Sequence, residues 1–540
     1  MATQTATELQ AFEPNSSLSK SPSRKERNQP PVDLETSSTQ PSASDNANGS
    51  GNAQTVMSRA RTTIVILQVC GLQLFSSFCN GVVVIALPSM QPTLGLKESL
   101  LVWPTSSYYL TAGCFLLLAG CVADVAGTKR VNLVGALLSA IFAMACGLAQ
   151  TGGQLIAFRA LQGVTNAITT PASVSIISNY IEEGRSRNMG FACLGVGQPL
   201  GFSLGLVLTG VITDTVGWRP AFYLPAACNF ALFLVGLWAL PKDTRPEVGH
   251  SVWTRLAKEI DWMGVFLASA GLAMLTYVLA SLSANIHSIH EASSIALLTV
   301  SALCLAAFVG WMHIQVKSNR TALIPNSLWR SHIFTSCCIM VFLTNALCNC
   351  MELYSSLFFQ QVQGSSALGA SLQVLPSLVA GAITNISTGV FVNRMPVMWT
   401  VLVSSVLSAV APLLMALIRI DQIYWENAFF GQILTPISCD ILFTVGLLIV
   451  SDVFPKHMQA LSGAVFNTCA QLGTAIGLSV TQVIASSVTA DSSYTDKSSP
   501  GALMAGYRVA FWTMFGWMVA VCVVCVVGLR KVGGVGVKRD

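Results

Sequence analysis

Long apolar runs and short polar breaks alternate along this chain from about residue 60 to about residue 530. Each run has the length of about 20 residues that a helix needs to cross the hydrocarbon core of a bilayer. The pattern therefore predicts an all-α polytopic membrane protein with fourteen transmembrane helices. We place these spans at 62–87, 102–122, 131–149, 153–178, 189–210, 219–240, 262–283, 294–315, 333–357, 368–391, 398–418, 427–450, 461–486 and 508–529.

Composition excludes several classes of protein. Of 540 residues, 53% are hydrophobic and only 10% are charged, which is far from the composition of a soluble globular protein. The net charge of +5 comes without a basic run interleaved with aromatic residues, so nucleic acid is not an expected partner. Most of the 16 cysteines fall inside apolar runs, where they act as small packing residues. We expect no cofactor and no metal site.

Polar segments flank the predicted spans. Residues 1–58 are rich in Ser, Thr, Asn, Pro and Gln and predict a disordered cytoplasmic tail, and residues 531–540 form a short second tail. Of the 29 Lys and Arg residues, 23 fall on the side of the two termini, five fall on the opposite side, and Arg159 lies within a span. This bias places both termini in the cytoplasm. We expect the plasma membrane, with the vacuolar membrane as the alternative.

The short turn between the second and third spans, Gly120 to Arg130, reads GCVADVAGTKR. A fainter copy, Gly389 to Arg394, lies between the corresponding spans of the last six, although such a turn could also arise without relation. The repeat predicts six-helix bundles at 59–240 and 333–530, joined by a linker with two inserted transmembrane helices at 241–332. Gly120, Asp124, Gly127, Lys129 and Arg130 are the candidates for a conformational latch, and a solvated turn is the alternative for Asp124.

The turn resembles the signature loop of the major facilitator superfamily, G-x-x-x-D-x-x-G-x-[KR]-[KR]. Arg159-Ala160-Leu161-Gln162-Gly163 is similar to the R-x-x-Q-G pattern of that family, and Ile260 to Gly264 resembles the entry to the extra helix pair of its 14-span drug:proton antiporters. Gly197-Gln198-Pro199-Leu200-Gly201 looks like the antiporter signature, with Gln198 in place of a glycine. The segments GQPLGFSLGLVLTG at 197–210 and GWRPAFY at 217–223 resemble fungal members of the family, namely aminotriazole-resistance, borate-efflux and secondary-metabolite exporters. The resemblance implies the major facilitator fold, and it implies that the helix with Gly197, Pro199 and Gly201 limits leak and favours export. Its glycines and Pro199, which lacks a backbone donor, predict a hinge or a helix that packs closely on a neighbour, and glycines that are simply common in membrane helices are the alternative.

Polar side chains at helical spacing mark four of the predicted spans. Ionisable and amide groups within a membrane usually face a cavity, because exposing them to lipid is costly. We predict that they form a substrate and proton pathway, and ordinary hydrogen bonds between helices are the alternative. The candidates are Gln73 and Asn80 in the first span, Arg159, Gln162 and Asn166 in the fourth, Asn345, Asn349 and Glu352 in the ninth, and Gln432 and Asp440 in the twelfth.

One departure from the family affects the mechanism. Where its first span usually carries an acid, this chain has Cys79. If transport is proton-driven, Glu352 and Asp440 are the best-placed carboxyl groups, since removal from water favours the protonated form that a proton carrier must visit. Arg159 stays protonated at any usable pH, so it would bias a neighbouring acid or bind an anionic substrate.

These observations predict a secondary active efflux pump, an antiporter that exports drugs, toxins or secondary metabolites in exchange for protons. One alternative is a facilitator, importer or exporter of a small polar solute such as ammonium or borate, and another is a membrane sensor that does not transport. No Walker loop or nucleophile elbow appears in any predicted cytoplasmic segment, and the chain is not expected to be an enzyme. The expected partners are a small-molecule substrate, protons and the lipid bilayer, and we expect a monomer.

Overall fold

The computed structural model describes residues 58–97, 100–181, 185–241, 260–284, 286–318, 324, 326–391, 396–454 and 456–530. These residues belong to one compact unit, Thr55–Asp540. The predicted tails, 1–58 and 531–540, lie outside the described residues except for Ser58, and nothing about them is tested.

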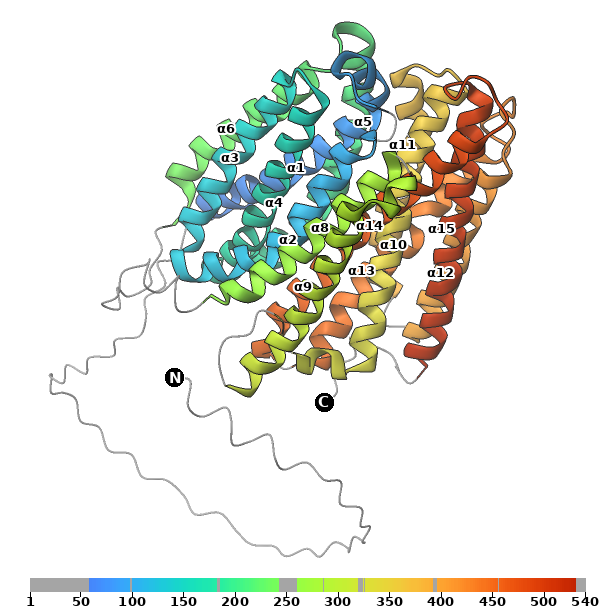
Figure 1. The fold of residues 1–540 in the computed structure, drawn as a ribbon. Coiled ribbons are helices and arrows are strands. Elements are labelled where there is room, and N and C mark those ends of the chain that lie inside the picture. Colours follow the sequence, from blue (N-terminus) through green and yellow to red (C-terminus); the bar gives the residue numbers. More distant parts are fainter. Residues whose placement is uncertain are drawn as a thin grey trace, which may run out of the picture. The chain divides into compact units, whose positions relative to one another are not determined.

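Fourteen α-helices make up the described part of the chain (Figure 1). Each corresponds to one predicted span, so the predicted fold class is confirmed. The helices are α1 Arg59–Leu94, α2 Trp103–Ala126, α3 Thr128–Leu148, α4 Gly152–Tyr180, α5 Arg185–Val216, α6 Pro220–Ala239, α8 Trp262–Ala284, α9 Ala292–Lys317, α10 His332–Leu357, α11 Ala367–Phe391, α12 Val397–Leu417, α13 Ala428–Val453, α14 Lys456–Asp491 and α15 Pro500–Gly528. Short turns flank them at η3 Ile286–His290, η4 Asn326–Arg330 and η5 Phe358–Val362.

Thirteen of these helices are long and apolar enough to cross a membrane, within the residues described. The helix α4 is long enough but is not among them, because its polar side chains, including Arg159 and Gln162, lower its hydropathy. Several helices extend beyond the predicted spans. In particular, α1 continues through Pro88 and Pro92 to Leu94.

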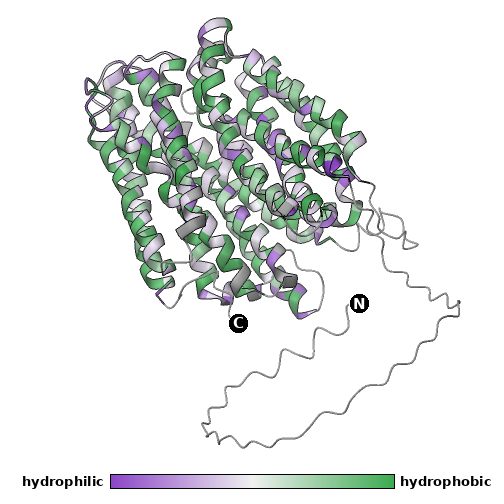
Figure 2. Cartoon of the chain, turned by 180° about the vertical axis from the view of Figure 1, so that it is seen from behind, coloured by the Kyte–Doolittle hydropathy of each residue, from purple (hydrophilic) through white to green (hydrophobic). Residues whose placement is uncertain are grey.

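The helices form two groups in the described part of the chain. Helices α1–α6 pack against one another, and so do α10–α15; we call these sets the N-terminal bundle and the C-terminal bundle. Of the inserted pair, α8 contacts α2 and α14, and α9 packs on α8. The bundles meet where α2 packs on α14 and α5 packs on α11. Figure 2 shows hydrophobic residues over most of the length of the helices, as expected for surfaces in contact with lipid.

Successive helices alternate in direction, which defines two ends of the bundles. We call the end where α1 begins and α15 ends the terminal end, and the opposite end the distal end. At the terminal end, Arg61 Nε of α1 donates to the Ala239 carbonyl of α6 at 2.9 Å. At the distal end, Arg508 Nη2 of α15 donates to the Ile418 carbonyl after α12 at 3.2 Å.

Candidate transport pathway

Arg159 is the centre of the polar residues of the N-terminal bundle. Its side chain is fully buried, with 0% of its surface exposed. Within the described residues it has no carboxylate partner, and neutral groups from three helices hold it instead. Its nitrogens donate to the Pro104 carbonyl of α2 at 3.0 Å, to Gln162 Oε1 of α4 at 2.7 Å and to Asn80 Oδ1 of α1 at 2.6 Å.

The other candidates of α1 and α4 are linked to Arg159 by a series of side-chain contacts. The guanidinium lies over the ring of Tyr108, 4.4 Å from its centroid. The Tyr108 hydroxyl is 2.9 Å from Ser76 Oγ, which donates to Asn166 Oδ1 at 3.1 Å. Thr170 Oγ1, one turn further along α4, donates to Gln73 Oε1 at 3.3 Å. The five candidates of α1 and α4 therefore lie together, while their part in transport stays a prediction.

Three amide candidates of the C-terminal bundle are already hydrogen-bonded inside it. Asn345 Nδ2 donates to the Val341 carbonyl of its own helix at 3.0 Å. Asn349 Nδ2 donates to Thr474 Oγ1 of α14 at 3.2 Å. Gln432 is almost fully buried, and its amide donates to Ser355 Oγ of α10 at 2.9 Å. Asn349 and Gln432 thus tie helices together, which matches the alternative stated for these stripes.

The two carboxyl groups, Glu352 of α10 and Asp440 of α13, are neighbours. They lie close enough to interact electrostatically. Both side chains are half-buried, and Glu352 Oε1 is 4.0 Å from the Cys348 thiol. Two carboxylates this close repel each other when both are ionised.

Sequence reasoning missed the site in which Asp440 lies. The Asn385 amide of α11 lies near Asp440, and it donates to the Gly381 carbonyl at 3.3 Å. A Cβ atom at Gly381 would lie 2.8 Å from Asp440 Oδ2, so a larger residue there would require the carboxylate to shift. The available signal was a Gly and an Asn four residues apart in an apolar span.

Tyr109 of α2 connects the two polar centres across the interface. It lies within electrostatic reach of Arg159 in its own bundle and of Glu352 in the other. Its ring packs edge-on against Tyr108 with centroids 5.2 Å apart. Glu352 therefore lies on the side of the C-terminal bundle that is near α2 of the N-terminal bundle.

The structure shows the surroundings of four of the five latch candidates. Gly127 joins α2 to α3 with φ of 99°, a conformation that favours glycine. An added Cβ at Gly120 would meet only Pro171 at an ordinary 3.9 Å, so no close approach requires glycine there. Lys129 Nζ donates to the Leu240 carbonyl at 2.7 Å and so caps the end of α6, whereas Arg130 is exposed. The Asp124 side chain lies outside the described residues, and its latch role stays a prediction.

The glycines of α5 allow it to pack closely on α1. A Cβ at Gly201 would overlap the Leu74 carbonyl, and one at Gly197 would lie 3.3 Å from the Cys70 carbonyl. The helix is continuous through Pro199. The close-packing part of the prediction for Gly197, Pro199 and Gly201 thus has a structural basis, and the hinge part is untested.

Two helical bundles that meet around buried polar and acidic side chains define a membrane transport protein. The chain belongs to the Major Facilitator Superfamily, whose family model matches residues 69–478. This confirms the predicted superfamily, which consists of secondary transporters and not of enzymes. The fold agrees, because the structure is similar to the POT family transporter PepTSo with a TM-score of 0.62 at 13% identity, over 88% of this chain and 98% of that one.

Three curated relatives come from fungi. The chain is 39% identical over 527 residues to MFS-type transporter 1 of Pyricularia oryzae, covering 89% of this chain and 85% of that protein. It is 26% identical to the Low affinity ammonium transporter of Saccharomyces cerevisiae, over 72% of this chain and 74% of that protein. It is 24% identical to the Aminotriazole resistance protein of the same yeast, over 76% and 74% of the two chains.

Proposed function

We propose that this protein is a proton-coupled exporter of drugs, toxins or secondary metabolites. It works by alternating access in the plasma membrane, with both termini in the cytoplasm, and the terminal end therefore faces the cytoplasm. The observation that carries the proposal is the pair Glu352 and Asp440, half-buried neighbours in the C-terminal bundle, of which Glu352 lies near Tyr109 of the N-terminal bundle. Arg159 supports it by keeping a fixed positive charge on the opposite bundle.

The acid pair offers a mechanism for coupling. When both groups face the acidic outside, one takes up a proton, and the charge at the interface falls. When they face the cytoplasm, the proton leaves and the acid is again available to a substrate. The relative named for aminotriazole resistance supports export of an organic compound as the coupled step.

Transport of a small polar solute such as ammonium is the second candidate. Two observations favour it: Cys79 stands where the resembling antiporters carry an acid, and one relative is named an ammonium transporter. This candidate needs no exchange of protons at Glu352.

Accumulation of a panel of toxins, borate and ammonium tests both functions. It is measured in cells with and without the gene, and with and without a protonophore. We expect the protein to lower toxin accumulation only while the proton gradient is intact. Glu352→Gln or Asp440→Asn should abolish that dependence at equal protein levels in the membrane.

Glu426→Gln is the matched control, because Glu426 is exposed at the distal surface and bonded only to Gln422 among described residues. It should transport as the unmodified protein does. Unchanged proton dependence in both acid variants would refute the coupling. Ammonium or borate movement that ignores the protonophore would establish the second candidate instead.

A further inference from the structure

Near the distal end of α1, Pro88 leaves one backbone carbonyl without its usual donor within the helix. Proline has no N–H, so the carbonyl of Val84, four residues earlier, loses its usual partner within the helix. In the structure Ser356 Oγ of α10 donates to this carbonyl at 2.9 Å. An acceptor that the sequence of one bundle leaves open is thus satisfied by a hydroxyl of the other bundle.

The turn that follows α10 directs two more polar side chains at α1. Residues Phe358–Val362 form a π-helical turn, a distortion that occurs frequently at functional sites. Gln360 Nε2 donates to the Ile85 carbonyl at 3.0 Å, and Gln361 Nε2 donates to Gln91 Oε1 at 3.2 Å. The Tyr507 hydroxyl donates to Gln361 Oε1 at 2.6 Å and fixes the orientation of that amide.

A second contact between the bundles lies at the same end. Asp214, at the distal end of α5, accepts from the backbone N–H groups of Ala367 at 3.2 Å and Leu368 at 3.0 Å. These belong to the first turn of α11, whose N–H groups have no partner within the helix and attract negative charge. The pairs α1–α10 and α5–α11 are therefore both bonded at the distal end.

We propose that Ser356, Gln360 and Gln361 form the distal gate of the transport path. Their bonds to α1 hold the bundles together at this end, and the path opens to the distal side of the membrane only when these bonds break. Opening then leaves the Val84 carbonyl without a protein partner, because Pro88 cannot supply one. The gate requires the two alternating conformations proposed above, but it requires neither protons nor a particular substrate.

Hydrogen–deuterium exchange of the full-length protein in lipid nanodiscs tests the gate. The variant carries Ser356→Ala and Gln360→Ala. The informative segments are 210–216 and 367–372, which bond across the interface but not to either altered side chain. If the gate holds the distal end closed, exchange there should rise by about fivefold for each hydrogen bond removed.

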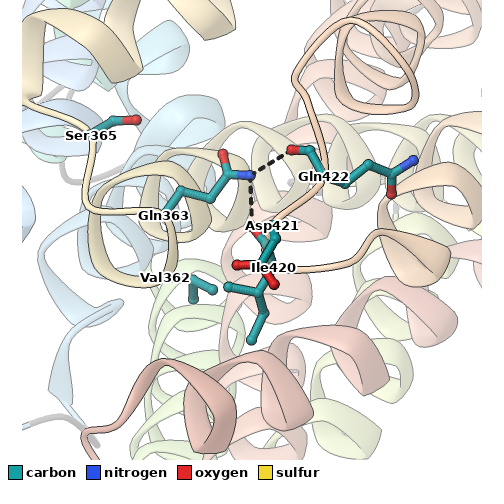
Figure 3. A pocket seen from close by; sticks show the side chains of 6 residues that line it. All are labelled: Val362, Gln363, Ser365, Ile420, Asp421 and Gln422. Carbon is teal, nitrogen blue, oxygen red and sulfur yellow. Dashed lines mark hydrogen bonds between the residues drawn. The ribbon is translucent and has the colours of Figure 1, made fainter.

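Gln363→Ala is the matched control. Gln363 follows the same turn, but its amide donates to the carbonyls of Ile420 at 3.2 Å and Gln422 at 3.3 Å, within its own bundle (Figure 3). We expect faster exchange only in the loop around 418–423. Pro88→Ala restores a donor to Val84, so Ser356→Ala should add less opening to that variant than to the unmodified protein.

Two results would overturn the gate. One is an increase confined to the α1 and α10 segments beside the altered side chains, with 210–216 and 367–372 unchanged. The other is an equal increase at those segments in Gln363→Ala. If the double variant does not purify as a single species, Gln360→Met is measured in the same way and is judged by the same two results. Because exchange is measured without substrate, failure of proton coupling would leave the outcome intact.

Discussion

The two bundles differ in the partners that surround their charged side chains. In the N-terminal bundle, Arg159 is sealed from solvent and held by neutral oxygens from three helices. In the C-terminal bundle, Glu352 and Asp440 are half-buried and lie beside each other. The N-terminal bundle therefore surrounds a basic side chain with neutral partners, whereas the C-terminal bundle places two acidic side chains next to each other.

The comparison assigns different tasks to residues that looked alike in sequence. The hydrogen bonds of Arg159 to its three oxygen partners, which we call the arginine cage, join α1, α2 and α4. They stabilise the N-terminal bundle, and Arg159 also supplies charge. The acids are half-buried and carry the groups that can bind and release a proton. Stability should therefore depend on Arg159, and the response to pH should depend on the acids.

Replacing Arg159 is expected to have the largest effect. Arg159→Met removes three hydrogen bonds and leaves Asn80 Oδ1 and Gln162 Oε1 without this donor, at a cost of about 2 kcal/mol in the free energy of unfolding. Thermal unfolding of the purified protein measures it. Arg419→Met, at an exposed loop position, is the control and should leave the unfolding temperature unchanged. Equal effects of the two variants on the unfolding temperature would contradict the inference that the hydrogen bonds of Arg159 stabilise the bundle.

Displacing Asp440 without removing it should have a smaller, purely functional effect. Gly381→Ala places a methyl group 2.8 Å from Asp440 Oδ2, so the carboxylate must shift away from Asn385. Turnover should fall on the order of tenfold, because small misplacements of a reacting group are costly. Gly516→Ala in α15 meets nothing within 4 Å and should transport normally. A proton dependence unchanged by Gly381→Ala would show that Asp440 does not need this site.

Adding a carboxyl group to the N-terminal bundle at Cys79 should have the smallest effect on stability. The buried Cys79 lies within electrostatic reach of Arg159, so Cys79→Asp would give the guanidinium a carboxylate neighbour. The cost of burying the acid and the gain from the ion pair largely cancel, so the unfolding temperature should move little. Transport measured against pH should gain a second titrating step. Cys79→Asn is the uncharged control, and identical pH profiles for both variants would reject the idea.

The sequence was sufficient to predict the helices and their polar faces, because both follow from local apolar runs and helical spacing. It was not sufficient to separate Gln432, which bonds Ser355, from Asp440, which lies beside Glu352. That distinction depends on which helices pack together. The contact of Gly381 with Asp440 and the π turn after α10 depend on packing in the same way. The role of Asp124, and the proton pathway itself, remain predictions that placement alone does not test.

The contact between α1 and α5 restricts which residues these helices can accept. A methyl group at Gly201 or Gly205 would meet the backbone of Leu74 or Phe78, and one at Gly81 would lie 2.6 Å from the Phe202 carbonyl. A backbone cannot rotate aside as a flexible side chain can. Even alanine, the smallest possible change, is therefore excluded at these three positions unless the two helices separate along their length.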